Sequence, residues 1–591
     1  MRTRKLPYRK LVVAFLVIFS LTGSLAGPTT AESQKTTLTI AFDGDLTSLN
    51  TFYWRIVADL DTLRLIYEPM FRISTEGLAV PNIVKDWSVS SDGLTWTFQI
   101  TNNITWHDGI PLTAEDVKFS LEFIRDHALP YLGTIGELTE TVEITGEWEV
   151  KMTLKSAFAP LAIVMGEFGF VVPKHIWEPL EDPATFTNEE AIGNGPFKFV
   201  EREPGAYVRL EANDNYFRGR PYVDEVIIKI IPSLDAQTLA IRKGEIDMMH
   251  NVPVGPHIRV LMGAENVKVV AAPSTNIQYL SINCRPERAP LHIKELRQAM
   301  AYAMDRETFV SVIADGFGDP ADSFITPSLS FWYNPDVPKY AFNLTRAYEL
   351  LDSINFKDRN GDGVRETPAG KPLEFELLTG NWGNGPRIAK MLKSMLAEIG
   401  VDVKIKLADS ASYWDLLLTR RDFDMSQAGW RLYFDPDPYI YESFHTSRDI
   451  PGGLNWVGYN STYDHIPDTF DKLAEAQRTA VDINERQELL FKMQDALTEY
   501  LPWIPLIYPD LLYVVRTDTF EGWVPMTRYG LMNLWTFLNV RPPGAVTQTV
   551  TTKETVTVVS EVPVWAATIV TAIVVFGLII PHTLRRIKKL R

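Results

Sequence analysis

The sequence predicts a large α/β fold for the body of the chain, because strand-like and helix-like segments alternate along it. Alternating apolar and polar residues predict strands at 37–42 and 95–100. Apolar residues at helical spacing predict helices at 294–304, 385–399 and 484–499. A chain of 591 residues is long enough for two or three domains, and no internal repeat divides it.

Local signals predict where some of these elements begin and how they are buried. Thr113 predicts a helix start, because Asp116 three residues later can complete a capping box. The helix at 385–399 leads directly into a predicted strand at 401–407, and strand–helix alternation of this kind places ligands at loops beyond strand ends. Residues 226–231 are nearly all apolar and predict a strand buried on both faces of a sheet.

The amino-terminal segment predicts export from the cell. Basic residues between Arg2 and Lys10 precede an apolar run at 11–19, and small residues follow it. This order is typical of a secretory signal peptide, which we expect at 1–31. The alternative is a membrane-spanning helix, which the short run and the polar sequence after it disfavour.

The carboxyl-terminal segment predicts a membrane anchor. Residues 564–580 carry no charge, and a basic tail follows at 582–591. An uncharged span of roughly 17–19 residues can cross a bilayer, and a basic cluster stays on the cytoplasmic side. We expect a transmembrane helix at 562–581, preceded at 542–561 by a Thr-rich stalk that cannot pack as a domain. The alternative is a buried terminal helix of the body.

Composition narrows the classes of function. The chain carries a net charge of −16 and both ends are basic, so its body is more acidic still and is not suited to bind nucleic acid. Cys284 is the single cysteine, so a large core rather than an internal disulfide must supply the stability. Asn103, Asn343 and Asn460 begin glycosylation sequons and predict a glycoprotein, although such sequons also arise by chance.

Several long blocks together resemble a known family. Between Gly193 and Met249 the sequence contains GNGPFKFVEREPGAYVRLEANDNYF, GRPYVDEVIIKIIP and LAIRKGEIDMM. Further blocks read DWSVSSDGLTWTF, WHDGIPLTAEDVKFSLEF, LRQAMAYAMDRETFV and YLPWIPLIYPDLLYVVRTDTFEGW. From about residue 37 to residue 538 the chain resembles family 5 of the bacterial and archaeal solute-binding proteins, the dipeptide and oligopeptide binders of ABC importers.

The resemblance implies a fold and a function. It implies the two-lobed periplasmic-binding-protein fold of class II, with an extra α/β domain inserted in the first lobe. Lobe I would comprise residues 36–52, 195–272 and 512–541, the inserted domain 53–194, and lobe II 273–511. A monomeric ectodomain, anchored outside the cell in an archaeal-type arrangement, would close around a di- or oligopeptide and deliver it to the membrane permease.

The resemblance also implies where the ligand binds. In relatives the backbone at the positions of Gly429, Trp430 and Arg431 pairs with an extended peptide. The Asp that holds the ligand amine in relatives is replaced here by Tyr433. Asp435 or Asp437 could supply the carboxylate instead, although Asp-Pro pairs also form plain turns. Further candidates for the pocket are Asn276, Tyr279 and Trp382; for the tryptophans core packing is the alternative.

A second site is predicted from the residues themselves. Asp358, Asn360 and Asp362 alternate as in a calcium-binding loop, and Glu366 follows. A full EF-hand has Glu at the twelfth position, where Ala369 stands. We expect structural Ca²⁺ here and no required cofactor; the alternative is an acidic turn.

The sequence leaves other functions open for this protein. An oligosaccharide binder of the same family, a surface sensor and an extracellular hydrolase are the alternatives. The hydrolase lacks any H-E-x-x-H, G-x-S-x-G or P-loop motif, so we expect no enzyme activity. His107 and Asp108 in WHDG are predicted to form a structural turn rather than a catalytic pair.

Overall fold

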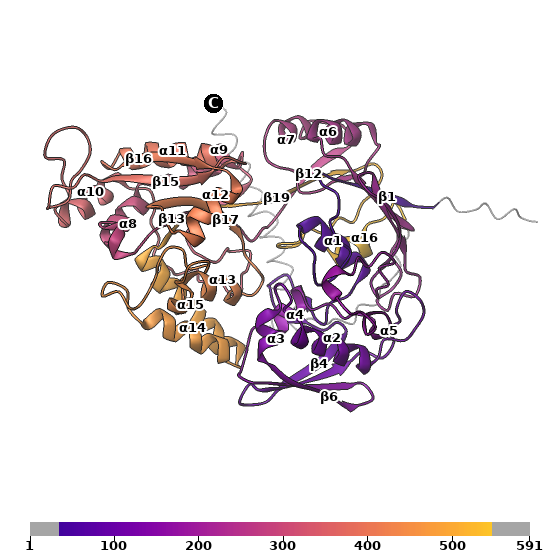
Figure 1. Cartoon of the computed structure of the whole chain (residues 1–591). Helices are drawn as coiled ribbons and strands as arrows, with labels where there is room; N and C mark the ends of the chain where they lie inside the picture. The colour runs from indigo at the N-terminus through magenta and orange to yellow at the C-terminus, as the bar shows by residue number, and fades with distance from the viewer. Residues whose placement is uncertain (1–34, 546–591) are drawn as a thin grey trace, which may run out of the picture.

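The computed structural model describes residues 35–545, in which a pair of α/β lobes lie side by side above a smaller third domain (Figure 1). The expected signal peptide, the anchor, the basic tail and most of the stalk lie outside the described residues. No helix between residues 35 and 545 has the length and apolar character needed to cross a membrane.

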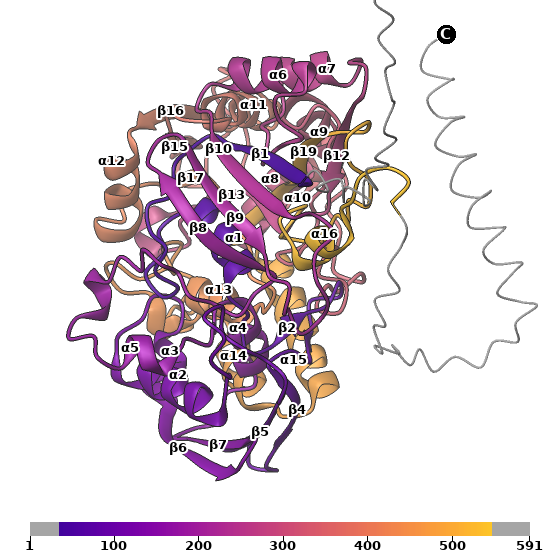
Figure 2. The ribbon, with the colours of Figure 1, turned by 90° about the vertical axis from the view of Figure 1, so that its right-hand side faces the viewer.

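The first lobe contains a mixed seven-stranded sheet whose strand order is β12-β19-β11-β1-β10-β9-β8. Strand β1 is parallel to both β10 and β11, whereas the other pairs are antiparallel. The strands are β1 (Thr37–Phe42), β8 (Phe197–Glu203), β9 (Tyr207–Ala212), β10 (Glu225–Ile230), β11 (Met248–Met249), β12 (Val267–Ala272) and β19 (Leu511–Arg516). The sheet is accompanied by α1 (Val57–Ile66), α6 (Leu234–Lys243), α7 (Pro256–Leu261) and α16 (Leu534–Asn539). Figure 2 shows β8, β9 and β10 side by side on the outer side of this lobe.

One expectation for this sheet is wrong. Strand β10 is not buried on both faces, because Val226 and Ile228 are buried but Ile227, Lys229 and Ile230 remain partly exposed. One face of β10 therefore packs in the core and the other meets solvent, as antiparallel neighbours allow.

The second lobe contains a six-stranded mixed sheet in the order β14-β18-β13-β17-β15-β16. Its strands are β13 (Asn276–Ile282), β14 (Gly318–Pro320), β15 (Glu374–Gly380), β16 (Asp402–Ala408), β17 (Met425–Arg431) and β18 (Trp503–Pro509). Its helices are α8 (Lys294–Tyr302), α9 (Arg306–Ile313), α10 (Leu344–Ser353), α11 (Gly385–Ala397), α12 (Ser410–Trp414), α13 (Asp437–Phe444), α14 (Thr469–Thr479) and α15 (Ile483–Tyr500). A π-helical turn, η3 (Asp415–Thr419), continues α12.

The third domain is built around an antiparallel sheet in the order β4-β5-β7-β6. Its elements are β2 (Arg72–Ile73), β3 (Ala79–Val80), β4 (Val84–Val89), β5 (Thr95–Ile100), β6 (Thr139–Gly146), β7 (Glu149–Leu154), α2 (Ala114–Asp126), α3 (Gly133–Leu138), α4 (Leu161–Glu167) and α5 (Lys174–Trp177). The chain enters this domain after β1 and leaves it before β8, so the domain is an insertion between two strands of the first sheet.

The predicted start of α2 is confirmed by hydrogen bonds. The hydroxyl of Thr113 accepts from the Glu115 amide, and Asp116 accepts from the Thr113 amide at 2.8 Å, which completes the capping box of α2. Arg306, after α8, donates to the carbonyls of Ala301 and Met304 at the end of that helix, at 3.2 and 3.4 Å.

Along the described chain, only two connections between the large sheets join the first lobe to the second. One runs from β12 to β13 and the other from β18 to β19, so the two crossings lie close to each other in neighbouring strands. Two short, adjacent crossings are the arrangement that permits hinge motion between lobes.

Candidate functional site

A cavity of about 460 Å³ opens in the second lobe at its boundary with the first lobe. Its walls come mainly from β13, β17 and the loop after β15, with Val254 reaching it from the first lobe. The lining residues most relevant to binding are Asn276, Gln278, Trp382, Tyr413, Trp414, Gln427, Gly429, Trp430 and Arg431. A volume of this size suits a small organic ligand or a short stretch of a longer one.

The cavity exists because β15 and β17 diverge. The two strands pair in parallel only at Leu377 with Met425 and at Leu378 with Ser426. Beyond this point β15 pairs with β16 alone, whereas β17 continues to Arg431 with β13 as its single partner. The second half of β17 therefore has one free edge, and that edge borders the cavity.

The alternation of a strand identifies which backbone groups face the free edge. The amide of Leu432 donates to the Thr275 carbonyl, so residues 428, 430 and 432 direct their backbone groups toward β13. The Gln427 carbonyl points the other way, where it accepts from the Tyr413 hydroxyl at 3.0 Å. By the same alternation Gly429 and Arg431 direct their N–H and C=O groups into the cavity.

Gly429 keeps this edge open to a second backbone. It is exposed although its neighbours on the strand are buried or half-buried. A Cβ placed on it would lie 2.3 Å from Nε2 of Gln278 on the adjacent strand. Only glycine therefore fits beside Gln278 without displacing that side chain.

Two amide side chains form a fixed polar floor. Gln427 donates through Nε2 to Oε1 of Gln278 at 2.9 Å, and its Oε1 accepts from the Thr379 hydroxyl at 3.1 Å. Because both ends of the Gln427 amide are engaged, its orientation is set before any ligand binds.

Aromatic rings form the apolar walls. Trp382 is 45% exposed, lies over Gly380 and meets the Tyr413 ring edge to face at 5.5 Å. Trp430 is half-buried, with its ring centroid 6.2 Å from that of Trp456. Exposed aromatic faces in a concave site suit apolar side chains or the faces of sugar rings.

The cavity therefore brings together Asn276, Trp382, Gly429, Trp430 and Arg431 of the residues predicted from the sequence. The other predicted residues lie elsewhere. Tyr279 is fully buried and its ring is stacked on Trp503 at 4.0 Å, which is a core contact. Tyr433 packs on Phe168 of the inserted domain at 5.4 Å, so it lies at the interface between that domain and the second lobe.

The two aspartates proposed to hold a ligand amine have partners within the protein. Both Asp435 oxygens accept from Arg486 at 2.6 and 2.7 Å, and both side chains are almost completely buried. Asp437 pairs with Arg478 at 3.0 Å and is equally buried. Neither carboxylate lines the cavity, and their ion pairs brace α13 against α14 and α15.

Sequence reasoning missed the amide pair Gln278 and Gln427 and the aromatic residues Tyr413 and Trp414. Gln278 could have been predicted, since it lies between the two predicted residues Asn276 and Tyr279 on β13. Tyr413 and Trp414 carried no such signal, because only the tertiary fold brings α12 to the end of β17.

A larger cavity of about 770 Å³ lies between residues 47–55 and 184–204. Trp54 lines it and stacks on Tyr131 at 4.4 Å with nearly parallel planes. Phe199 and Arg202 of β8, an edge strand of the first sheet, also line it. The smaller cavity is the better candidate, because it contains most of the residues that the resemblance implies for the ligand.

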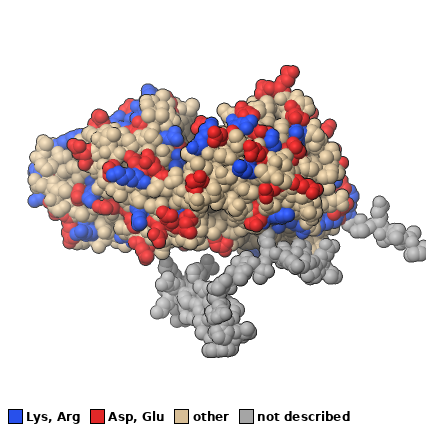
Figure 3. Space-filling view, turned by 90° about the horizontal axis from the view of Figure 1, so that it is seen from below, with Lys and Arg blue, Asp and Glu red and all other residues tan. Residues whose placement is uncertain are grey.

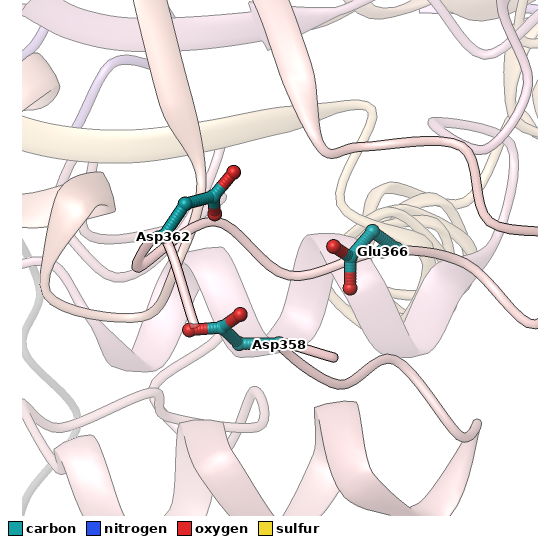
Figure 4. A group of neighbouring side chains, drawn as sticks. All are labelled: Asp358, Asp362 and Glu366. Carbon is teal, nitrogen blue, oxygen red and sulfur yellow. The ribbon is translucent and has the colours of Figure 1, made fainter. Parts of the chain in front are cut away.

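The predicted calcium loop is compact. Oxygen atoms of Asp358, Asp362 and Glu366 lie within 4.8 Å of one another, and the three carboxylates surround one space (Figure 4). Each Asp358 oxygen accepts a backbone N–H, from Gly361 at 2.7 Å and from Gly363 at 3.0 Å. The oxygen-rich loop fits a hard cation.

The fourth predicted ligand of this loop points differently. The Asn360 amide nitrogen donates to Asp362 at 2.9 Å, while its oxygen accepts from the Asp362 amide. In this arrangement Asn360 stabilises the turn, and its side chain would have to rotate to offer an oxygen to a cation.

His107 and Asp108 have structural contacts. Nδ1 of His107 accepts from the Gly193 amide at 3.2 Å and Nε2 donates to the Gly195 carbonyl at 3.1 Å. Asp108 pairs with His175 at 2.8 Å. The His107 ring therefore connects its own turn to the turn at Gly193–Gly195, which is the structural role predicted from the sequence.

Two α/β lobes joined by adjacent crossings, with a cavity at their boundary, define a ligand-binding protein of the two-lobed periplasmic type. The chain matches the family described as bacterial extracellular solute-binding proteins, family 5, over residues 79–451. It belongs to that family.

Individual relatives agree with this membership. The oligopeptide-binding protein AppA of Bacillus subtilis is 30% identical, and the match covers 89% of this chain and 96% of AppA. The structure of AppA in complex with a nonapeptide has a TM-score of 0.65 at 28% identity and covers 86% of this chain and 100% of AppA. The ABC transporter substrate-binding protein CtaP of Listeria monocytogenes has a TM-score of 0.73 at 27% identity, with the same coverage.

Proposed function

We propose that this protein captures peptides in the cavity beside β17 and delivers them to an ABC importer. The observation that carries the proposal is the free edge of β17, where Gly429 and Arg431 direct backbone donors and acceptors into the cavity. An extended peptide can satisfy those groups by adding a strand, whereas a sugar offers no matching ladder. AppA, which is named an oligopeptide binder and holds a nonapeptide in its structure, supports this choice.

The mechanism needs binding and closure but no bond-making step. The Gln278 and Gln427 amides offer fixed polar contacts, and the rings of Trp382 and Trp430 cover apolar side chains. Closure of the first lobe over the cavity would enclose the peptide, because only the closed state contacts it from both sides.

A backbone-modified peptide series tests the proposal. The full-length protein is titrated with peptides of two to nine residues, and the tightest binder is then resynthesised with single N-methyl groups. We expect alternate N-methyl positions to weaken binding at least about tenfold, because each removes a donor that a ladder requires. Uniform tolerance of N-methylation would contradict strand addition, and binding of oligosaccharides but no peptide would contradict the peptide assignment.

We also propose the arrangement of the chain in the cell. A signal peptide at 1–31 would export the body, and the helix at 562–581 would anchor it, with the stalk at 542–561 as spacer. The uncharged span and the basic residues after it support this arrangement. Release of the protein from membranes by removal of residues 562–591 would support the anchor, and equal membrane association without them would contradict it.

We propose further that the body divides at about residues 52, 194, 272 and 511, and that it acts as a monomer. The four sheets of the described residues fall within these divisions to within one residue, which supports them. Helix α1 is the exception: Asp61 on it pairs with His250 of the first lobe at 3.0 Å. Among the sequons, Asn103 and Asn343 are exposed, whereas the Asn460 amide donates to Asp449, so Asn103 and Asn343 are better acceptors for a glycan than Asn460.

We propose finally that the loop at 358–366 binds Ca²⁺ as a structural ion rather than a cofactor. The three converging carboxylates support this assignment. Thermal unfolding of chelator-treated protein with and without added Ca²⁺ is the measurement that tests it.

A further inference from the structure

The charge distribution of the cavity bears on which peptides it accepts. Among the described residues that line it, Arg431 alone is charged. No carboxylate lines this cavity, so a ligand that depends on a cationic group would find no counter-ion there.

Arg431 itself lacks a counter-ion. Its guanidinium donates to the carbonyl of Arg528, a neutral acceptor, and its Nε is buried without a hydrogen-bond partner. It forms no ion pair with any carboxylate of the described residues within 4 Å. Burial lowers the pKa of Arg431 and the positive charge of Arg528 lowers it further, whereas the negative charge of Asp61 raises it without reversing the net decrease. A half-buried guanidinium in this position is stabilised by any anion that can reach it.

The acidic groups near Arg431 have other partners. Asp61 is shared between Arg64 at 3.2 Å and His250 at 3.0 Å. Glu167 is paired with Arg528, and its second oxygen accepts from the Phe434 amide at 3.1 Å. Asp61 and Glu167 thus form their ion pairs with other residues, and Arg431 has no carboxylate of the described residues within ion-pair distance.

We infer that the ligand supplies the missing anion: a peptide carboxylate pairs with Arg431 when the peptide adds to the edge of β17. This inference rests on the proposed function and deepens it, since it selects peptides by charge. The carboxylate has two sources, the carboxyl terminus of the peptide and an acidic side chain, and both offer the planar oxygen pair that a guanidinium binds.

A matched set of peptides tests the inference on the full-length protein. The tightest peptide that lacks Asp and Glu is compared as the free acid and as the carboxyl-terminal amide. An amidated version with one Glu and its Gln counterpart form the second pair. We expect one pair to differ at least about tenfold in affinity, in favour of the anionic member, as charge-assisted hydrogen bonds give.

The variant Arg431→Gln makes the assignment specific. We expect it to abolish the preference, so that the anionic and the neutral member of each pair bind with equal affinity. Arg387→Gln is the matched control, because Arg387 is exposed on α11, does not line the cavity and loses the same charge. Arg431→Lys, which keeps the charge, should retain part of the preference.

The outcomes separate the two proposals. If no peptide binds at all, the proposed function fails. If peptides bind but neither pair shows a preference, only the carboxylate inference fails. If the preference persists in Arg431→Gln and is lost in Arg387→Gln, a different arginine holds the anion. If Arg431→Gln does not fold, the peptide pairs are compared on the unmodified protein and on Arg431→Lys. A preference for the anionic peptide that is equal in both proteins would contradict the pairing with Arg431.

Discussion

At the scale of the residue, Gly429 decides whether a second backbone can approach β17. Its substitution Gly429→Ala places a Cβ 2.3 Å from Gln278 and forces that amide to move, which breaks its hydrogen bond with Gln427. We expect peptide affinity to fall roughly tenfold, or about 1–2 kcal/mol, with little change in melting temperature.

The double variant Gly429→Ala with Gln278→Ala is the control, since removing the Gln278 side chain relieves the clash. Isothermal titration should show that the alanine at 429 costs little in that background. An affinity of Gly429→Ala equal to that of the unmodified protein would mean that the backbone there does not meet the ligand.

His107 predicts a pH dependence of stability. Burial lowers its pKa to about 4, and its Nδ1 accepts from Gly193, so the folded protein holds the ring neutral. In the unfolded chain the His107 ring takes up a proton below its unperturbed pKa of about 6.5. In the folded protein the ring takes up that proton only near pH 4. The contribution of His107 is therefore present above pH 6.5 and is lost as the pH falls toward 4, by at most about 3 kcal/mol.

Chemical denaturation between pH 4 and 7 measures the slope of the free energy of unfolding against pH. We expect His107→Gln to flatten it, because glutamine does not titrate. His257→Gln is the control, since His257 is partly exposed beside Asp235. An unchanged slope in His107→Gln would show that other groups cause the acid sensitivity.

Asp435 separates a structural from a ligand-binding role. Its ion pair with Arg486 is almost completely buried, and loss of one partner leaves an unpaired buried charge. We expect Asp435→Asn to lower the free energy of unfolding by about 3 kcal/mol while the affinity of folded molecules is unchanged. Glu265→Gln, an exposed carboxylate on a loop, should change neither quantity. Loss of peptide affinity without a change in the free energy of unfolding would show that Asp435 binds the ligand.

At the scale of the element, the loop at 358–366 joins two segments of the second lobe and can be tested alone. We expect Ca²⁺ to raise the melting temperature of chelator-treated protein, by the equivalent of about 2.7 kcal/mol at a hundredfold excess over the dissociation constant. Asp358→Asn should abolish the shift, because Asp358 is the first carboxylate of the loop.

Mg²⁺ at the same concentration is the control, since it demands a stricter octahedral geometry and should shift the melting temperature less. No change with either ion would leave the loop as an acidic turn held by its own backbone hydrogen bonds.

The elements themselves were largely readable from the sequence. Strands β1 and β5 and the capping box of α2 lie where the patterns predict them. Strand β17 spans Met425–Arg431, and the local pattern of apolar and polar residues does not predict it. Its small and polar residues, SQAG, carry little strand signal, and pairing with β13 overrides that weak propensity.

At the scale of the whole molecule, closure of the lobes is the motion on which function depends. The positions Leu239 on α6 and Leu407 on β16 are both more than half exposed and belong to different lobes. With spin labels on Leu239→Cys and Leu407→Cys, we expect peptide to shorten the distance distribution. The native Cys284 is buried and should not react.

A label pair within the second lobe, at Leu407→Cys and Ile483→Cys, is the control and should keep its distance distribution. An unchanged distribution of distances between the lobes with peptide bound would contradict closure.

The surface seen in Figure 3 carries interspersed acidic and basic side chains.

The sequence alone determined the family and the α/β class, because these follow from local patterns and from blocks of residues in a fixed order. The role of residues 429–431 was implied only by the resemblance to that family. The sequence also indicated the acidic loop, whose ligands lie within nine residues of one another. What it could not decide is which polar residues are free to meet a ligand.

That distinction came from the tertiary structure. Asp435 and Asp437 are paired with Arg486 and Arg478, from segments more than forty residues away, whereas Arg431 is left without a carboxylate. The partner of a charged side chain depends on how distant segments pack, and no local pattern records it.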